Sequence, residues 1–153
     1  MKSKIKELAK QYFAEIVQIR RHLHKYPELS FQEKETSKYI QNILNTWGIE
    51  FKTNYTNTGI VGVIQGQSPN SNVTALRADF DALPILEKND IDYCSVNSGV
   101  MHACGHDAHT AMLLGAAEAL STLKEKINGE IRFIFQPAEE GYGGAKFMIE
   151  DGA

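Results

Sequence analysis

Residues 101–109, Met-His-Ala-Cys-Gly-His-Asp-Ala-His, contain three histidines, a cysteine and an aspartate within nine positions. The carboxylate pair Glu139 and Glu140 follows about thirty residues later. Imidazole, thiolate and carboxylate groups are the usual ligands of Zn²⁺ and of its first-row neighbours. A mixed set of nitrogen, sulfur and oxygen donors differs from the four-ligand pattern of structural zinc sites, and it leaves room for a reactive water. The conjunction of the two segments therefore predicts a metal site with an open position.

The composition is that of a globular domain. The chain has 153 residues, of which 42% are hydrophobic and 23% charged, so one domain with a real core is expected. A net charge of −3 and the lack of any Lys and Arg run argue against nucleic-acid binding. Because no stretch has the apolar character of a signal peptide or membrane span, we expect a cytoplasmic protein without membrane contact.

Two amphipathic helices are predicted at the N-terminus. Apolar residues recur at three- and four-residue spacing over residues 3–24, and Pro27 ends this pattern. A second helix is predicted over residues 31–47. Ser30 is in the position of its N-cap, and Glu33 has the spacing of a capping box.

The chain then changes to short runs rich in β-forming residues. These runs cover residues 51–55, 60–64 and 73–77, and turn-forming Asn, Gly, Ser and Pro separate them. Residues 79–101 show no regular periodicity. A long irregular connection is uncommon in a compact domain unless it has a function, so this segment is where a site is expected.

A buried helix and a buried strand follow the irregular segment. Residues 106–124 are apolar nearly all round, which indicates a helix inside the protein. Residues 131–135 form a strand that Pro137 ends, and Gly143 with Gly144 begins a last helix. Strand, loop, helix and strand in this order make a βαβ unit. Together with the earlier strands, it predicts an α/β/α sandwich around a mixed sheet.

The candidate ligands gather where a site is expected in such a fold, because open α/β sheets bind ligands beyond the carboxyl ends of their strands. Three pairs fall there: Asp79 with Asp81, Glu139 with Glu140, and Cys104 with His106 at the entry to the buried helix. A helix N-terminus lowers the pKa of a nearby thiol and favours the thiolate. If residues 139 and 140 are extended, their side chains point in different directions, so one can bind metal while the other faces the water.

Three motifs resemble those of a known enzyme group: RADFDALPI at 77–85, GVMHACGHDAH at 99–109 and FQPAEEG at 135–141. They are similar to the dinuclear metal amidohydrolases of the zinc-aminopeptidase-like superfamily, above all to the N-acyl-amino-acid amidohydrolases, hippurate hydrolases and auxin-conjugate hydrolases. The similarity covers essentially the whole chain, with an early echo at 20–30. It implies a zinc-exopeptidase-like catalytic domain and a hydrolase acting on N-acyl amino acids or similar small amides.

The resemblance also assigns roles residue by residue. It implies that Cys104, His106 and Glu140 bind metal and that Glu139 is the general base, which takes a proton from a water between the metals. It implies two divalent ions, Zn²⁺ or Mn²⁺, with Co²⁺ and Ni²⁺ as alternatives. The thiolate favours Zn²⁺, but ligand softness alone does not decide the metal.

One motif departs from the pattern of the wider superfamily, in which a His-x-Asp precedes the proline, the His binding metal and the Asp orienting it. Here Asp79 stands at the place of that ligand, followed by Phe80 and Asp81. Asp81, like Glu139, is a candidate catalytic residue. Its expected role is to orient a metal ligand rather than to bind the metal itself. Roles for Asp79, His102 and His109 stay open.

The resemblance further implies that residues 1–153 are the N-terminal part of a catalytic metal-binding domain. In the family, further histidine ligands and a dimerisation or lid domain come later in the sequence, and the full-length form is expected to be a homodimer or homotetramer. Two alternatives follow, namely a truncated and catalytically inactive fragment or a partial metal-binding module. A thiol-redox protein using Cys94 and Cys104 is a weaker alternative, because the two cysteines lack the spacing of a resolving pair.

Overall fold

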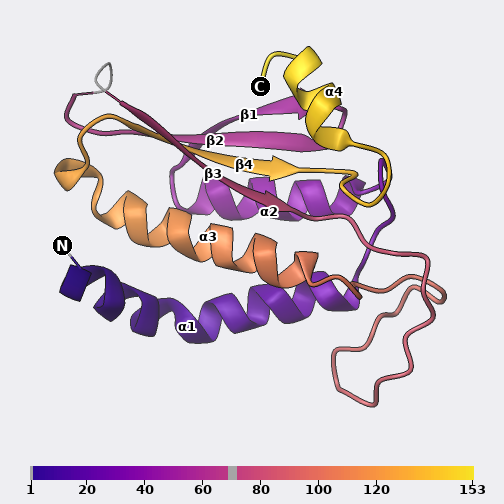
Figure 1. The fold of residues 1–153 in the computed structure, drawn as a ribbon. Helices are drawn as coiled ribbons and strands as arrows, with labels where there is room; N and C mark the ends of the chain where they lie inside the picture. Colours follow the sequence, from indigo (N-terminus) through magenta and orange to yellow (C-terminus); the bar gives the residue numbers. More distant parts are fainter. Residues whose placement is uncertain (1, 69–71) are drawn as a thin grey trace.

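A four-stranded mixed sheet is the framework of the computed structural model, which describes residues 2–68 and 72–153 (Figure 1). Its strand order is β1-β2-β4-β3. β2 pairs antiparallel with β1 and with β4, whereas β3 pairs parallel with β4. The strands are β1 (Glu50–Tyr55), β2 (Gly59–Gln65), β3 (Val73–Asp79) and β4 (Glu130–Gln136). The predicted α/β class and mixed sheet are confirmed.

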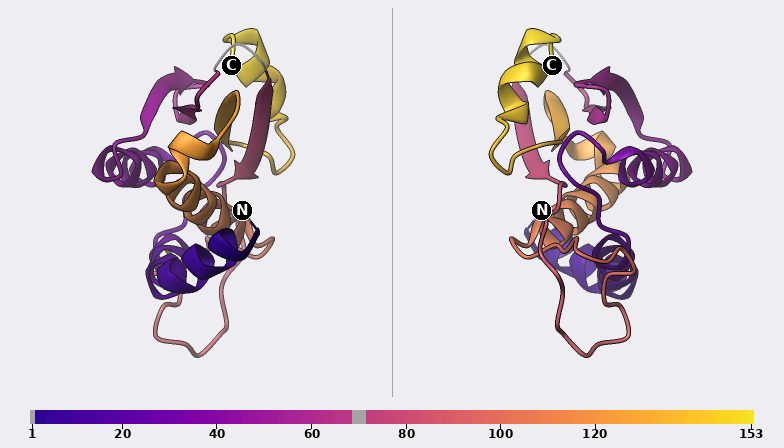
Figure 2. Two further views of the ribbon diagram at one scale, coloured as in Figure 1. Left: turned by 90° about the vertical axis from the view of Figure 1, so that its left-hand side faces the viewer. Right: turned by 90° about the vertical axis from the view of Figure 1, so that its right-hand side faces the viewer.

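Helices pack unequally on the two faces of this sheet. They are α1 (Lys2–Lys25), α2 (Lys34–Thr46), α3 (His106–Thr122) and α4 (Gly144–Glu150), with a 3₁₀ turn at Lys124–Lys126. α2 and α3 cover one face, and α1 packs against α3 on the side away from the sheet (Figure 2). The short α4 lies on the opposite side of the sheet, so the second helical layer of the sandwich is a single helix in the described residues.

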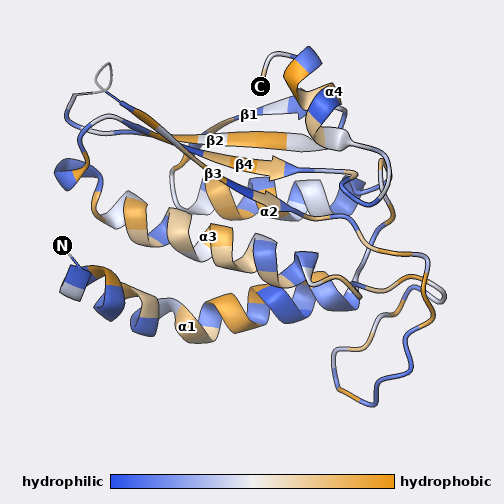
Figure 3. Ribbon diagram, in the orientation of Figure 1, coloured by the Kyte–Doolittle hydropathy of each residue, from blue (hydrophilic) through white to orange (hydrophobic). Residues whose placement is uncertain are grey.

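The position of α3 between α1 and the sheet explains why its sequence is apolar nearly all round. Leu114 is fully buried and belongs to one core cluster with Ile60, Phe133 and Phe135. Hydrophobic residues colour long stretches of β2 and of the middle of α3 (Figure 3). On the other side of α3, a Cβ added at Gly115 would lie 3.0 Å from side-chain carbons of Ile16. Glycine therefore allows α1 to approach closely, which offsets its cost of about 1 kcal/mol inside a helix.

The start of the second helix differs from the prediction. α2 begins at Lys34 rather than at Phe31, because Phe31 has a φ of 63°, outside the right-handed helical region. Ser30 is not an N-cap, since its hydroxyl donates a 2.7 Å hydrogen bond to Asp81. Glu33 makes no capping bond either, and its carboxylate accepts the backbone N–H of Ala138 instead. Ser30 and Glu33 thus bond to partners distant in sequence, and the carboxylate of Glu28 accepts the N–H groups of Glu35 and Thr36 in the first turn of α2 instead.

The irregular segment was predicted correctly. Between β3 and α3 the chain forms isolated bridges only, which pair Leu29 with Ala82 and Leu83 with Met101. Both cysteines are free. Among the helices of residues 2–68 and 72–153, none has the length and apolarity needed to cross a membrane.

Replacing Leu114 by alanine should lower the free energy of unfolding by roughly 2–5 kcal/mol, because it leaves a cavity at the centre of the core. Met112→Ala is the matched control, since Met112 lies in the same helix with 60% of its surface exposed. That control should change stability by less than about 1 kcal/mol. Urea unfolding followed by circular dichroism measures both variants, and equal losses would contradict the buried orientation of Leu114.

The interface between α1 and α3 contains a destabilising carboxylate. Glu118 of α3 is 9% exposed, and its Oε2 has no hydrogen-bond partner among the described residues. Burial, with a smaller contribution from the charge of Glu15, raises the pKa of Glu118 to about 7. A carboxyl group whose pKa is raised on folding favours the folded state below its unfolded pKa, and this advantage is lost as pH rises through the folded value.

Glu118→Gln should therefore stabilise the protein at pH 8 by roughly 1–3 kcal/mol and have a much smaller effect at pH 4. Thermal unfolding across this pH range measures the difference. Glu15→Gln should act in the same direction but more weakly, because it removes only the smaller of the two causes. A pH-independent difference between Glu118→Gln and the parent chain would refute this explanation.

Candidate metal centre

The parallel pairing of β3 with β4 brings the carboxyl ends of both strands to one edge of the sheet. Asp79, the last residue of β3, is in register with Gln136, the last residue of β4. The loops that leave these strands meet the first turn of α3 there, on the right-hand side of Figure 1. We call the polar side chains at this place the donor cluster; it consists of Asp79, Cys104, His106, His109, Glu139 and Glu140.

Three residues predicted to bind metal come together. One ligand atom each from Cys104, His106 and Glu140 lies within 4.8 Å of the others. His106 is the first residue of α3 and is buried, whereas Cys104 is exposed and Glu140 is half-buried. Gly105 between them has a φ of 89°, a conformation that glycine adopts without steric cost. This backbone turn lets the thiol and the imidazole face the same space.

The orientation of His106 is set by Asp81. Nδ1 of His106 lies 3.0 Å from the carbonyl oxygen of Asp81 and 3.1 Å from its Oδ1. Both atoms are acceptors, so Nδ1 carries the proton and Nε2 keeps a free lone pair. Nε2 in turn lies 3.8 Å from Glu140 Oε1 and 3.8 Å from Glu139 Oε2. The lone pair of His106 is therefore on the side of the two carboxylates.

Asp81 is a buried acceptor that connects three segments of the chain. Its Oδ2 accepts the hydroxyl of Ser30 at 2.7 Å and the backbone N–H of Glu140 at 3.0 Å. Burial opposes the ionisation of Asp81, but the hydrogen bonds from His106, Ser30 and the backbone at Glu140 and Glu139 lower its pKa to about 2. Asp81 is thus charged at neutral pH, and it contacts His106 rather than the interior of the donor cluster.

Negative charge dominates the donor cluster. Burial opposes protonation of His106, but the carboxylates of Asp81 and Asp79 raise its pKa overall. Hydrogen bonding to Glu140, partial desolvation and the nearby carboxylates raise the pKa of the Cys104 thiol. These carboxylates act on the thiol in the direction opposite to the lowering expected from the helix N-terminus. A divalent cation among these groups would reverse that balance.

The donor set fits a divalent cation. Oε1 of Glu140 is buried without a hydrogen-bond partner in the described part of the chain, a condition that costs free energy unless another group satisfies the oxygen. Nε2 of His106 has a free lone pair, and Cys104 supplies sulfur. These three groups are the residues that would hold the ion.

Asp79 and His109, whose roles the sequence left open, lie beside His106. One ligand atom each from Asp79, His106 and His109 also falls within 4.8 Å of the others. Nδ1 of His109 lies 2.7 Å from Asp79 Oδ1, and Arg77 makes a 2.8 Å ion pair with Asp79 Oδ2. Asp79 therefore already has partners on both carboxylate oxygens.

His102 belongs to neither group of candidate ligands. It is 5% exposed, and neither ring nitrogen has a hydrogen-bond partner among the described residues. Burial lowers the pKa of His102 to about 4, so it is neutral at pH 7.

Sequence reasoning missed a buried polar network close to the site. Asp107 follows His106 directly. Its Oδ2 accepts a hydrogen bond from His24 Nδ1 at 2.8 Å and forms an ion pair with Arg20 Nε, also at 2.8 Å. Nε2 of His24 lies 3.0 Å from Glu87 Oε1. The network ties α1 to the first turn of α3. The similarity noted at residues 20–30 was the available signal for it.

The chain at Glu139 and Glu140 is a turn rather than the extended segment considered from the sequence. Ala138 has a φ of 52°, and the N–H of Gly141 bonds back to the carbonyl of Glu139. Both carboxylates consequently approach His106 instead of pointing apart. They differ in exposure, because 43% of the Glu139 side chain is accessible compared with 21% of that of Glu140.

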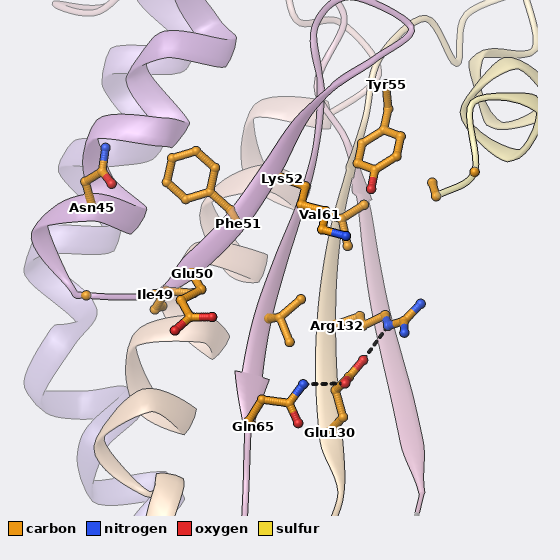
Figure 4. Close-up of a pocket in the computed structure, with 14 residues that line it drawn as sticks. Asn45, Ile49, Glu50, Phe51, Lys52, Tyr55, Val61, Gln65, Glu130 and Arg132 are labelled. Carbon is orange, nitrogen blue, oxygen red and sulfur yellow. Dashed lines mark hydrogen bonds and ion pairs between the residues drawn. The ribbon is translucent and has the colours of Figure 1, made fainter. Parts of the chain in front are cut away.

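A hollow in another part of the molecule is lined by different residues. It measures about 870 Å³ and is lined by residues of β1, β2 and β4, with Asn45 of α2 at its edge (Figure 4). Its polar residues include Glu130, which bonds to Gln65 and Arg132. None of the donor cluster lines this hollow.

Comparison with known proteins identifies the family of the chain. Peptidase family M20/M25/M40 matches residues 75–153, the stretch that carries the whole donor cluster, and the chain belongs to this family. An N-acyl-L-amino acid amidohydrolase of Geobacillus stearothermophilus is 48% identical over 99% of this chain and 41% of its own length. An N-acetyl-L-cysteine deacetylase of Bacillus subtilis is 50% identical over 90% of this chain and 33% of its own length.

A solved structure shares the fold closely. It is that of the Bacillus subtilis YXEP protein, described as a dinuclear metal-binding peptidase from the M20 family. The TM-score is 0.89 at 44% identity, covering 94% of this chain and 40% of that chain. The chain thus spans about 33–41% of the length of these relatives.

A polypeptide of residues 1–153 should bind divalent metal weakly, with a dissociation constant in the micromolar range or above. The candidate set has three ligands, Cys104, His106 and Glu140, and a chelate with few ligands is weak. Cys104→Ser or His106→Ala should abolish that binding in a calorimetric titration with Zn²⁺. Cys94→Ser is the control, since Cys94 is also a free cysteine but lies outside the donor cluster. Nanomolar binding of two ions would show that the ligand set is larger than proposed.

Proposed function

We propose that the chain is the metal-binding part of an amidohydrolase that cleaves the amide bond of N-acyl amino acids or similar small amides. The observation that carries the proposal is the convergence of Cys104, His106 and Glu140 with Glu139 at one sheet edge. Membership of the M20/M25/M40 family supports hydrolysis as the reaction. The names of the Geobacillus and Bacillus relatives support N-acyl amino acids as the substrate class.

Cys104, His106 and Glu140 are the proposed metal ligands. The reaction is proposed to use two divalent ions, Zn²⁺ or Mn²⁺, with Co²⁺ and Ni²⁺ as alternatives, and the thiol of Cys104 favours Zn²⁺. When bound, such ions polarise an amide carbonyl and lower the pKa of water.

The remaining roles belong to side chains that do not need to bind metal. Glu139 is the proposed general base, which accepts a proton from the attacking water and returns it to the nitrogen of the broken amide bond. Its greater exposure supports this assignment, because the base must meet both water and substrate. Asp81 is proposed to hold His106 in the tautomer that presents Nε2 to the metal.

Residues 1–153 are proposed to form the N-terminal part of the catalytic domain. The greater length of the relatives supports this assignment. Additional histidine ligands and a dimerisation domain are proposed to come from further sequence, with a homodimer or homotetramer as the complete enzyme.

Glu139→Gln should keep the metal and lose hydrolysis, whereas Glu140→Gln should lose the metal itself. Removing a general base lowers the rate by roughly 10² to 10⁴. Metal content is measured on the chain by atomic emission. Hydrolysis of acetylated and benzoylated amino acids is measured on a fusion of residues 1–153 to the remaining sequence of the Geobacillus relative.

Glu150→Gln serves as the control for this pair, because Glu150 is an exposed carboxylate on α4, away from the donor cluster, whose ion pair is with Lys146. Near-normal turnover of Glu139→Gln with unchanged metal content would show that Glu139 is not the base. Full metal content in Glu140→Gln would remove Glu140 from the ligand set.

A further inference from the structure

The backbone immediately before Glu139 and Glu140 is held in a sparsely populated conformation. Ala138 has a φ of 52° and is fully buried. For a residue with a Cβ, the left-handed region costs roughly 1–2 kcal/mol, and it persists only where neighbouring groups enforce it. The N–H of Gly144 bonds to the Ala138 carbonyl at 2.9 Å, which secures one side of the peptide.

Glu33 secures the other side. Its Oε1 accepts the backbone N–H of Ala138 at 2.9 Å, across 105 residues of sequence. Its Oε2 accepts the hydroxyl of Thr58 at 3.2 Å. Glu33 is 0% exposed, and a carboxyl group is costly to bury unless hydrogen bonds satisfy it. The position of this side chain is therefore determined by the bonds it makes.

Ser30, three residues before Glu33, also supports the backbone of the turn, at Glu140. Ser30 donates to Asp81 Oδ2, which accepts the N–H of Glu140. Phe31, between Ser30 and Glu33, has a φ of 63° and turns the chain so that both side chains can make these bonds. Residues 30–33 thus hold the backbone of the turn at two points. Glu33 bonds directly to the N–H of Ala138, and Ser30 acts on the N–H of Glu140 through Asp81.

We propose that Glu33 is a positioning residue, which sets the direction of the Glu139 and Glu140 side chains by holding the N–H of Ala138. The consequence for metal and proton transfer rests on the proposed function, whereas the contact with Ala138 does not. Glu33 lies outside the donor cluster and acts through the turn that it holds. Groups that orient metal ligands from behind typically change metal affinity by about 10- to 100-fold when they are replaced.

The test compares three variants of the chain. Glu33→Ala removes the acceptor and should weaken Zn²⁺ binding by roughly tenfold or more in calorimetry. Glu33→Gln keeps an amide oxygen that can accept the N–H of Ala138, so its loss of Zn²⁺ affinity should be clearly smaller than that of Glu33→Ala. Glu35→Gln is the control, because Glu35 is exposed and its salt bridge is to Lys38.

A second readout follows the turn without metal. Hydrogen exchange of the Ala138 amide, measured by NMR, should accelerate in Glu33→Ala and stay slow in the Gln and control variants. Adding Ala138→Gly to Glu33→Ala should restore part of the Zn²⁺ affinity, because glycine adopts a positive φ without the steric cost. A role for Glu33 in overall stability alone would not be rescued in this way.

Zn²⁺ affinity unchanged in a folded Glu33→Ala variant would overturn the proposal, as would equal losses in the Ala and Gln variants. If Glu33→Ala does not fold, Glu33→Asp decides, since it keeps the charge but shortens the reach to Ala138, and unchanged affinity with slow exchange would refute the role. A parent chain that binds no Zn²⁺ would count against the proposed function. Hydrogen exchange of the Ala138 amide would still test the contact with Glu33. Faster exchange in Glu33→Ala would support that Glu33 holds the turn, and unchanged exchange would refute it.

Discussion

The parallel pairing of β3 with β4 is the constraint on which the rest of the site depends. Because Asp79 and Gln136 end their strands in register, the two loops that follow leave the sheet at the same edge. α3 connects these strands and packs beneath them, so its first residue, His106, returns to that edge. Candidate ligands that are far apart in sequence therefore come together from different loops and from the start of α3.

Two carboxylates at this edge of the sheet differ in their hydrogen bonding. Asp81 has hydrogen-bond donors, whereas one oxygen of Glu140 has none among the described residues. Asp81 accepts hydrogen bonds from Ser30, His106 and the backbone of Glu140, so it is ionised although it is buried. Oε1 of Glu140, in contrast, has no hydrogen-bond partner among the described residues. The ionised Asp81 thus supports His106 from outside the donor cluster, and the unbonded oxygen of Glu140 stays available to a cation.

Two of the described non-glycine residues with a positive φ lie where the chemistry is expected, whereas Asn54, Thr56 and Asn57 lie at or next to the turn between β1 and β2. Ala138 and Phe31 both have positive φ values, and each lies next to a group that supports or belongs to the donor cluster. Strain of this kind is retained where the surrounding structure enforces it, and it gathers at functional sites. Here the enforcing contacts come from Glu33 and Ser30, which lie at the start of α2 and outside the donor cluster.

Helices and strands followed from hydrophobic periodicity, which is a local property, and the donors Cys104, His106 and Glu140 followed from motif spacing and resemblance. Only the tertiary structure decided what Ser30 and Glu33 do. A capping box and a long-range support use the same residue types, and the actual partners, Asp81 and Ala138, lie 51 and 105 residues away. The raised pKa of the thiol was equally out of reach, because it depends on carboxylates that only folding brings together.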